Sequence, residues 1–421
     1  MKSLTLTLGS LILIAPVLAD IPVGRGDVSL DATAAATYDS NVFGIEDGAG
    51  DYYATLTPHA AYVRTAGELE ARANFGVAFE RYLHLTQLNA ANISADTSLL
   101  LSPDPSRKLS GTVEVAYVES SDVNTDVNER VDSKTATFTS TGAWITGPRT
   151  DLTYTASYSD VTRNVASDQR LLNAEMIADY KDFLDGYNAR LTGDFDDAQS
   201  SGQNVRGADL DQYSYSLMAG LGRGFYHDVL HAWVNAGYRI LERSDAEAGA
   251  NNAREASPVF SATLDGPFLP EKYFPKIKSS LEVSYESAST PGVDDTGGKV
   301  LAGSMHLTWQ ARPKTVVSFS AVRSQRLSAD DLTVVSSALQ LNVGQTFYYN
   351  LSGNVSAGYN WDTFRGIGRS DRTAIFSGGL KYLIGRTWTA TASYQYNKVQ
   401  SNLGVANYTR EITTLSLVHT F

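Results

Sequence analysis

The feature of this sequence that most limits its fold is an alternation of apolar and polar residues, which recurs from Asp27 to the end of the chain. A helix would place its apolar residues three and four positions apart, so the period of two predicts β-strands. The alternating segments are about 10 to 15 residues long, and a strand needs about 9 to 11 to cross a bilayer. In residues 69–80, one face carries Leu69, Ala71, Ala73, Phe75, Val77 and Phe79, and the other Glu70, Arg72, Asn74, Gly76, Ala78 and Glu80.

The apolar face of these segments is aliphatic in the middle and aromatic toward an end. Tyr359 with Trp361, and Tyr394 with Tyr396, are two such endings. Aromatic residues at strand ends are typical of membrane strands, where they meet the headgroup layers. A soluble β-sandwich, the alternative interpretation, would more often bury its aromatic residues centrally.

Short connections between the segments alternate with longer, acidic ones. This asymmetry is typical of outer-membrane barrels, which have short periplasmic turns and longer outer loops. We predict an all-β fold, a transmembrane antiparallel β-barrel of about 20 strands, with about 18 as the alternative count. The short set is 65–68, 147–149, 184–186, 312–314 and 385–386, and the long set is 40–51, 121–132, 199–211, 244–255, 290–297 and 364–371.

The amino terminus predicts export. Lys2 gives a positively charged start, and residues 4–18 are largely apolar. Val17, Leu18 and Ala19 then form a small-residue cleavage site, as in a secretory signal peptide. We therefore expect a signal peptide over residues 1–19 and a single barrel domain over residues 20–421. The predicted location is the outer membrane of a Gram-negative-type bacterium. The chain contains no cysteine, which is compatible with an oxidising compartment.

A barrel of about 20 strands is wider than its own side chains can fill, which predicts an aqueous lumen. None of the longer connections exceeds about 13 residues, so we expect no large loop to constrict that lumen. A charge facing lipid costs about 2 to 4 kcal/mol near the midplane, so the charged positions should face inward. The pore-lining candidates are Glu70, Arg72, Glu80, Tyr82, Glu175, Lys181, Arg190, Asp194, Trp233, Arg239, Lys278, Glu282 and Asn354.

A short polar and aromatic box ends the first predicted strand and consists of Tyr38, Asp39, Ser40, Asn41, Val42 and Phe43. With Pro58 in the next strand and Phe421 at the carboxy terminus, it resembles the putative β-barrel porin type 2 family. The resemblance implies an outer-membrane pore over the whole mature chain, associated with export of capsular or extracellular polysaccharide. The box is also typical of an Asx turn, in which side chains hydrogen-bond local backbone.

We therefore predict a passive conduit for polar solutes, with exported polysaccharide as the cargo. The alternatives are a general or small-solute diffusion porin and an outer-membrane hydrolase. Catalysis has little support, because none of the six histidines lies in a known catalytic spacing. His84 and His231 are the candidates at strand ends.

No motif indicates a cofactor or a metal, so we expect neither. The predicted partners are outer-membrane lipid and lipopolysaccharide, the barrel assembly machinery, the solute in the lumen and periplasmic export components. The formal net charge is -12, and the chain has no basic patch of the kind that binds nucleic acid.

The last strand supplies the first testable prediction. Phe421, His419, Leu417 and Leu415 share one face, and a terminal Phe on such a strand resembles the assembly signal of outer-membrane barrels. We predict that deleting Phe421, or changing it to Asp, leaves secreted chain in the periplasm in a protease-sensitive form. Heat-modifiable migration of the outer-membrane fraction measures assembly. Normal recovery of folded barrel from the deletion variant would contradict the role of Phe421.

Overall fold

The computed structural model describes residues 21–421 except 102–107, 125, 128, 202–209, 226–228, 246–252, 268, 270–275, 289–297, 329–332, 366 and 404–406. The predicted signal peptide, residues 1–19, lies outside the described residues. The strands are β1 (Ile21–Val23), β2 (Gly26–Asp39), β3 (Asp51–Ala66), β4 (Leu69–Tyr82), β5 (Ala90–Leu101), β6 (Leu109–Asn124), β7 (Glu129–Ile145), β8 (Thr150–Arg163), β9 (Asp168–Leu184), β10 (Tyr187–Ser201), β11 (Leu210–Phe225), β12 (Leu230–Asp245), β13 (Ala253–Asp265), β14 (Ile277–Ala288), β15 (Gly298–Arg312), β16 (Thr315–Leu327), β17 (Thr333–Tyr348), β18 (Leu351–Phe364), β19 (Arg369–Ile384), β20 (Trp388–Ser401) and β21 (Tyr408–Thr420). A short 3-10 helix, η1 (Thr86–Leu88), lies between β4 and β5.

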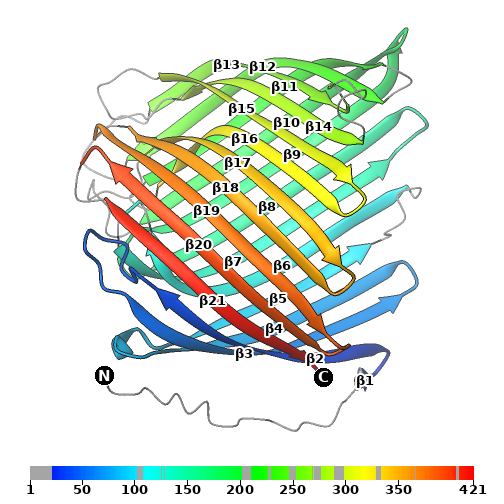
Figure 1. Ribbon diagram of the computed structural model, residues 1–421. Helices are drawn as coiled ribbons and strands as arrows, with labels where there is room; N and C mark the ends of the chain where they lie inside the picture. The colour runs from blue at the N-terminus through cyan, green and yellow to red at the C-terminus, as the bar shows by residue number, and fades with distance from the viewer. Residues whose placement is uncertain are drawn as a thin grey trace, which may run out of the picture.

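Strands β2 to β21 form a closed antiparallel barrel of 20 strands (Figure 1). Each strand pairs with the next in the chain, and β2 also pairs with β21, with Asp31 opposite Thr420 and Asp39 opposite Ile412. The three-residue β1 pairs only with the start of β2. Closure leaves the wall without a free edge. The predicted fold class and the count of about 20 strands are confirmed, and the alternative count of about 18 is wrong.

The two ends of the barrel differ in their connections. Tight hairpins such as those at Gly67, Gly186 and Gly385 gather at the end where β21 finishes, which we call the turn end. These glycines have φ of +61°, +75° and +69°, a region that residues with a Cβ adopt at a cost. The opposite end, at the left of Figure 1, carries connections such as 40–50 and is called the loop end. The predicted short turns are therefore confirmed at these positions, but the alternation of connection lengths is only partial, because 266–276 at the turn end is as long as 40–50 at the loop end.

Some loop-end connections are shorter than predicted, because the strands continue further than the sequence pattern suggests. β6 extends to Asn124 and β7 begins at Glu129, so only 125–128 connects them instead of the predicted 121–132.

The outer wall of the barrel is apolar and exposed. Met176, Val234 and Leu217 are 61%, 65% and 59% exposed, among many other large apolar side chains. A protein surrounded by water rarely exposes so much continuous apolar surface, whereas a bilayer covers it. Among the described residues, no helix has the length and apolar character to cross a membrane. The fold and this wall agree with the predicted location in the outer membrane.

Phe421 continues the pairing that closes the barrel. Its backbone N–H donates to the carbonyl oxygen of Leu30 at 2.9 Å. Its ring contacts His419 edge-on, with 4.4 Å between centroids, and His419 lies 4.2 Å from Trp388. The histidine therefore belongs to an aromatic row at the turn end of the outer wall. The role of Phe421 in assembly stays a prediction.

The alternation of faces gives a second prediction. Val355 is 48% exposed on the outer wall, and its neighbour Asn354 shares the opposite face with Ser356, which hydrogen-bonds Ser377 of β19. We predict that Val355→Arg costs about 2 to 4 kcal/mol because it puts a charge at mid-depth in lipid. The matched control, Asn354→Arg, should fold normally. Urea unfolding in lipid vesicles measures both, and equal stability of the two variants would contradict the assignment of faces.

Candidate functional site

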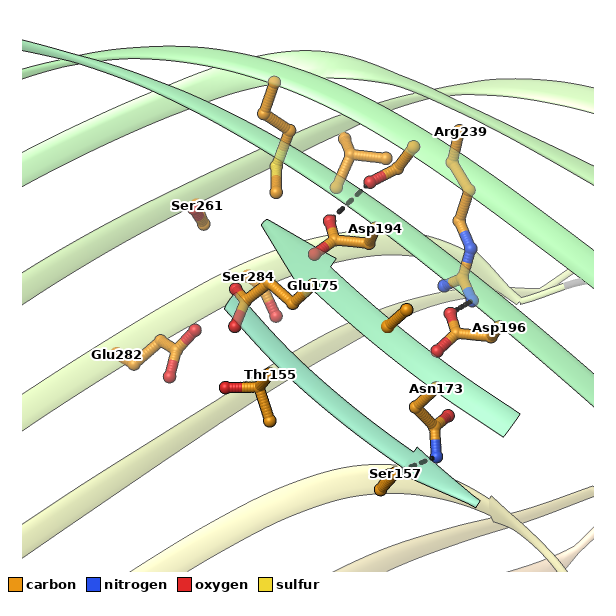
Figure 2. A pocket seen from close by; sticks show the side chains of 14 residues that line it. Thr155, Ser157, Asn173, Glu175, Asp194, Asp196, Arg239, Ser261, Glu282 and Ser284 are labelled. Atoms are coloured by element: carbon orange, nitrogen blue, oxygen red, sulfur yellow. Dashed lines mark hydrogen bonds and ion pairs between the residues drawn. The ribbon is translucent and has the colours of Figure 1, made fainter. Parts of the chain in front are cut away.

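The lumen wall formed by β8 to β14 carries an acidic pocket of about 380 Å³. Asp194 accepts a hydrogen bond from the hydroxyl of Ser216 at 2.6 Å, and Arg239 contacts Asp196 at 3.3 Å. Hydroxyl and amide side chains complete the lining, and Glu175 and Asp194 approach one another in Figure 2. With four carboxylates and one guanidinium, this wall attracts cations. The carboxylates are those of Glu175, Asp194, Asp196 and Glu282.

The acidic pocket does not have the geometry of a metal centre. In the part of the chain that the structure describes, no three His, Cys, Asp or Glu side chains are grouped so that they could hold a metal ion.

Several predicted lumen charges are paired across neighbouring strands. Arg190 donates two hydrogen bonds to Asp179, at 2.7 and 2.9 Å, and its guanidinium lies 4.0 Å from the ring centre of Trp233. Lys181 contacts Asp151 at 2.6 Å. These side chains are held by the wall, which leaves the carboxylates of the acidic pocket as the main net charge in this part of the lumen.

The remaining pore-lining candidates lie outside the acidic pocket and outside the charge pairs described above. Glu70 forms an ion pair with Arg72, and Lys278 and Asn354 are exposed. Glu80 lies close to the loop end, on the same strand as Tyr82. For all of these residues, a role in passage of solute stays a prediction.

A connection at the loop end reaches across the lumen. Asp126, between β6 and β7, accepts hydrogen bonds from both terminal nitrogens of Arg326 on β16, at 2.7 and 2.8 Å. In a barrel of 20 strands, β16 lies nine strands from β7, so this pair joins nearly opposite walls. The carbonyl oxygen of Asp126 also accepts a 2.5 Å hydrogen bond from Arg369 of β19.

Further contacts join distant strands at the same end. Gln169 of β9 donates to the carbonyl oxygen of Ser328, just after β16, at 2.6 Å, and Ser328 is fully buried. Arg410 of β21 contacts Asp122 of β6 at 3.0 Å. We call Asp39, Asp122, Asp126, Arg326, Arg369 and Arg410 the loop-end network.

The most buried apolar side chains of the described chain also lie at the loop end. Val42 and Val334 are completely buried, Phe364 and Val399 nearly so, and the guanidinium of Arg369 lies 4.3 Å from the ring centre of Phe364. Val334 and Phe364 form a small buried cluster there. The contacts at this end are made by strand-end arginines and a short connection, so the expectation that no large loop constricts the lumen stays a prediction.

The box at residues 38–43 joins the first strand of the barrel to the last. Asp39 accepts from the backbone N–H of Asn41 at 3.0 Å, which is the predicted Asx turn, and from Arg410 at 2.7 Å. The amide of Asn41 donates to the carbonyl oxygen of Thr409, and Ser40 exchanges hydrogen bonds with the backbone of Glu411. The turn interpretation is correct, and the box also anchors the loop-end network.

The aromatic and apolar members of the box divide between the two faces of the wall. Tyr38 contacts Tyr52 on the outer wall, with 4.7 Å between ring centroids. Val42 is completely buried at the loop end, and its carbonyl oxygen lies 3.5 Å from Arg130, which also donates to the hydroxyl of Tyr82. Phe43 is half-buried.

The contacts of His84 and the strand position of His231 indicate structural roles for the two histidines considered for catalysis. His84 contacts Asp51 at 2.8 Å through its ring, and Asp51 also accepts from the backbone N–H groups of His84 and Leu85. These bonds fix the connection after β4. His231 lies opposite Asp265 in the pairing of β12 with β13. Among the described residues, no serine hydroxyl hydrogen-bonds either imidazole.

Comparisons with known proteins agree with this fold. The family model described as Putative beta-barrel porin 2 matches residues 285–421, which confirms the predicted resemblance over that part of the chain. No curated protein matches the sequence.

Three solved structures show the same architecture. The alcaligin outer-membrane receptor FauA of Bordetella pertussis has a TM-score of 0.51 and 11% identity, over 95% of this chain and 77% of that one. The ferric-catecholate import receptor Fiu of E. coli K12, in its closed form, has a TM-score of 0.54 and 8% identity, over 94% of this chain and 82% of that one. The FrpB iron transporter of Neisseria meningitidis has a TM-score of 0.54 and 7% identity, over 93% of this chain and 81% of that one. At these identities the likeness is one of fold.

The prediction of a passive conduit for exported polysaccharide is wrong. The solved barrels that share this fold are described as receptors and an iron transporter, and none of these three is an enzyme. The loop-end network gives the physical reason, since an open conduit for a polymer has no place for ion pairs that join opposite walls.

The buried pair between Asp39 and Arg410 gives a third prediction. Both side chains are 10% exposed or less, and breaking a buried pair on one side leaves an uncompensated charge. Arg410→Met should therefore reduce the free energy of unfolding by about 3 to 5 kcal/mol. The double variant Asp39→Asn, Arg410→Met should recover part of that loss.

The matched control is Arg170→Met, which breaks the exposed pair of Arg170 with Asp160 and should cost less than about 1 kcal/mol. Urea unfolding in vesicles measures all three variants. Equal losses for Arg410→Met and Arg170→Met would show that the Asp39 pair does not anchor the loop end.

Proposed function

We propose that the protein is a selective transport barrel of the outer membrane that is closed at rest and opens when a solute engages its loop end. The loop-end network carries this proposal. A diffusion pore must be open without its solute, whereas a receptor exchanges its closing contacts for contacts with a ligand. The shared fold with import receptors and an iron transporter supports uptake as the direction.

The loop-end network has an alternative arrangement built into it. Arg326 also lies 3.8 Å from Asp362 of β18, and Oδ1 of Asp362 has no hydrogen-bond partner among the described residues. A ligand that displaces Asp126 would leave Arg326 beside this second carboxylate. Opening therefore avoids the cost of an unpaired charge, which is the main penalty for breaking a buried pair.

The charge of the lumen suggests the class of solute. Beyond the loop-end network, a solute passes Glu175, Asp194 and Glu282, which face the same space (Figure 2). Carboxylates on a pore wall favour cations over anions. We therefore propose a small polar solute with positive charge, and transport without catalysis by the chain itself.

The organisation of the chain is part of the same proposal. Residues 1–19 act as the signal peptide, residues 20–421 form one barrel domain, and the loop end faces the cell exterior. We further propose the barrel assembly machinery as the partner that recognises the strand ending at Phe421.

A fourth prediction tests closure. In planar bilayers, wild-type barrels should be mostly closed, and Asp126→Ala should raise the open probability about tenfold or more, because a charge-assisted hydrogen bond contributes about 1.5 to 3 kcal/mol. The matched control, Asp160→Ala, removes a half-buried carboxylate that pairs with Arg170 and not with the loop-end network, and it should change nothing. Steady, full conductance of the wild-type barrel would contradict a closed resting state.

The selectivity of the opened barrel gives a fifth prediction. With Asp126→Ala as background, we predict cation-selective reversal potentials across a salt gradient. Adding Glu175→Gln and Asp194→Asn should reduce the cation preference, because two fixed negative charges leave the wall. Unchanged selectivity would exclude the acidic pocket as the determinant while leaving closure itself untouched.

A further inference from the structure

The outer wall carries a groove of about 350 Å³ across β14 to β18. Its lining is almost entirely apolar and includes Leu301, Met305, Leu339 and Trp361. Leu301 and Leu339 are large side chains exposed on the outer wall. The groove therefore opens toward the hydrocarbon of the bilayer and not toward the lumen.

Two arginines occupy the same level of this outer wall. The strand register places Arg323 beside Ser337, Ser337 beside Trp361, and Trp361 beside Arg372, in one continuous row across β16 to β19. Directly opposite cross-strand neighbours point to the same face of a sheet. Because Trp361 is exposed on the outer wall, Arg323 and Arg372 face outward with it.

The guanidinium of Arg323 is held at the edge of the groove. Its Nε donates to the carbonyl oxygen of Leu301 at 3.1 Å, and Nη1 donates to the hydroxyl of Ser337 at 2.9 Å. Within the part of the chain that the structure describes, Arg323 and Arg372 form no ion pair with a carboxylate. Their positive charges are thus fixed in place without a protein counter-charge.

The depth of the row explains why the wall tolerates these arginines. Arg323 lies four residues before the loop-end limit of β16, and Trp361 three before that of β18. Aromatic side chains of this kind mark the level of the headgroups. The cost of Arg on the lipid face falls from about 2 to 4 kcal/mol at the midplane to about 0 to 1 near the interface. Phosphate groups of lipids lie at this same level.

We propose that the groove is a binding site for a phosphate-bearing lipid of the leaflet at the loop end. One acyl chain lies along Leu301, Met305 and Leu339, one phosphate accepts a hydrogen bond from Arg323, and a second phosphate of the same headgroup accepts from Arg372, three strands away. Guanidinium groups bind phosphate well because several donors face two oxygens at once. The site lies outside the lumen, so it stands independently of the proposed transport function.

The test compares lipids on the purified, folded barrel by native mass spectrometry. The probes are bisphosphorylated lipid A, the same lipid with its phosphates removed, and inorganic phosphate alone. Wild-type barrel should retain bisphosphorylated lipid A at least about tenfold more strongly than the dephosphorylated form, because charge-assisted hydrogen bonds contribute about 1.5 to 3 kcal/mol. Inorganic phosphate should neither bind nor compete.

Two variants separate the headgroup from the acyl chain. Arg323→Gln with Arg372→Gln should abolish the preference for the phosphorylated lipid. Ala321→Trp, which fills the groove from the lipid side, should weaken retention of both lipids. Heat-modifiable migration confirms folding of each variant, and neither change touches the lumen.

The matched control is Arg81→Gln, because Arg81 is an exposed arginine near the loop-end limit of β4, away from the groove. It should leave retention of both lipids unchanged. The proposal is overturned if wild-type barrel retains the two lipids equally, if the double arginine variant keeps the preference, or if inorganic phosphate displaces the lipid. That last outcome would indicate a free-anion site.

Discussion

The structure depends on one constraint, which is that every backbone N–H and C=O group of the wall needs a partner inside the bilayer. The pairing of β2 with β21 meets it, because this ladder from Asp31–Thr420 to Asp39–Ile412 removes the last two edges of the sheet. At the turn end the ladder continues into the hydrogen bond between Phe421 and Leu30. At the loop end it finishes in the buried pair of Asp39 and Arg410. Both ends of the closing seam are therefore fixed by specific contacts.

The same constraint explains why so much of the fold could be predicted from the sequence. Neighbouring residues on a membrane strand meet opposite solvents, so Val355 and Asn354 differ in character, and so do Phe195 and Asp194. The alternation therefore gave the strands, their faces and their approximate number. Tight turns such as those at Gly67 and Gly385 need a positive φ, which glycine signals locally. These features depend only on residues near one another in the chain.

The loop end could not be predicted in this way, because its contacts are not local. Asp126 and Arg326 are 200 positions apart, and Asp39 and Arg410 are 371 apart. The alternation of apolar and polar residues assigns each of these side chains to a face or a connection, but it does not predict which residue each one contacts. The only local signal was the box around Asp39 and Asn41, whose Asx turn was recognised while its bond to the last strand was not. Loop length was also a poor guide, since Asp126, in a four-residue connection, meets Arg326 of a nearly opposite strand.

The arrangement of charges along the lumen connects closure with selectivity. At the loop end, the guanidinium groups of Arg326, Arg369 and Arg410 each pair with a carboxylate, so a solute must replace an existing partner to enter. A cation can do so at Asp126, because Arg326 then still has Asp362 within reach at 3.8 Å. An anion that captured Arg326 would instead remove the two hydrogen bonds that Arg326 donates to the Asp126 carboxylate. Deeper in the lumen the balance ends, and the carboxylates of Glu175 and Glu282 outnumber the single guanidinium of Arg239 in the acidic pocket. In the proposed mechanism, a positively charged solute therefore gains favourable electrostatic contacts at the loop end and in the acidic pocket. To shift the loop end from about 1% to about 99% open, it must bind the open state about 5.5 kcal/mol more tightly than the closed one. A solute that makes three or four charge-assisted hydrogen bonds of about 1.5 to 3 kcal/mol each, in excess of the contacts that it replaces at Asp126, would supply that difference.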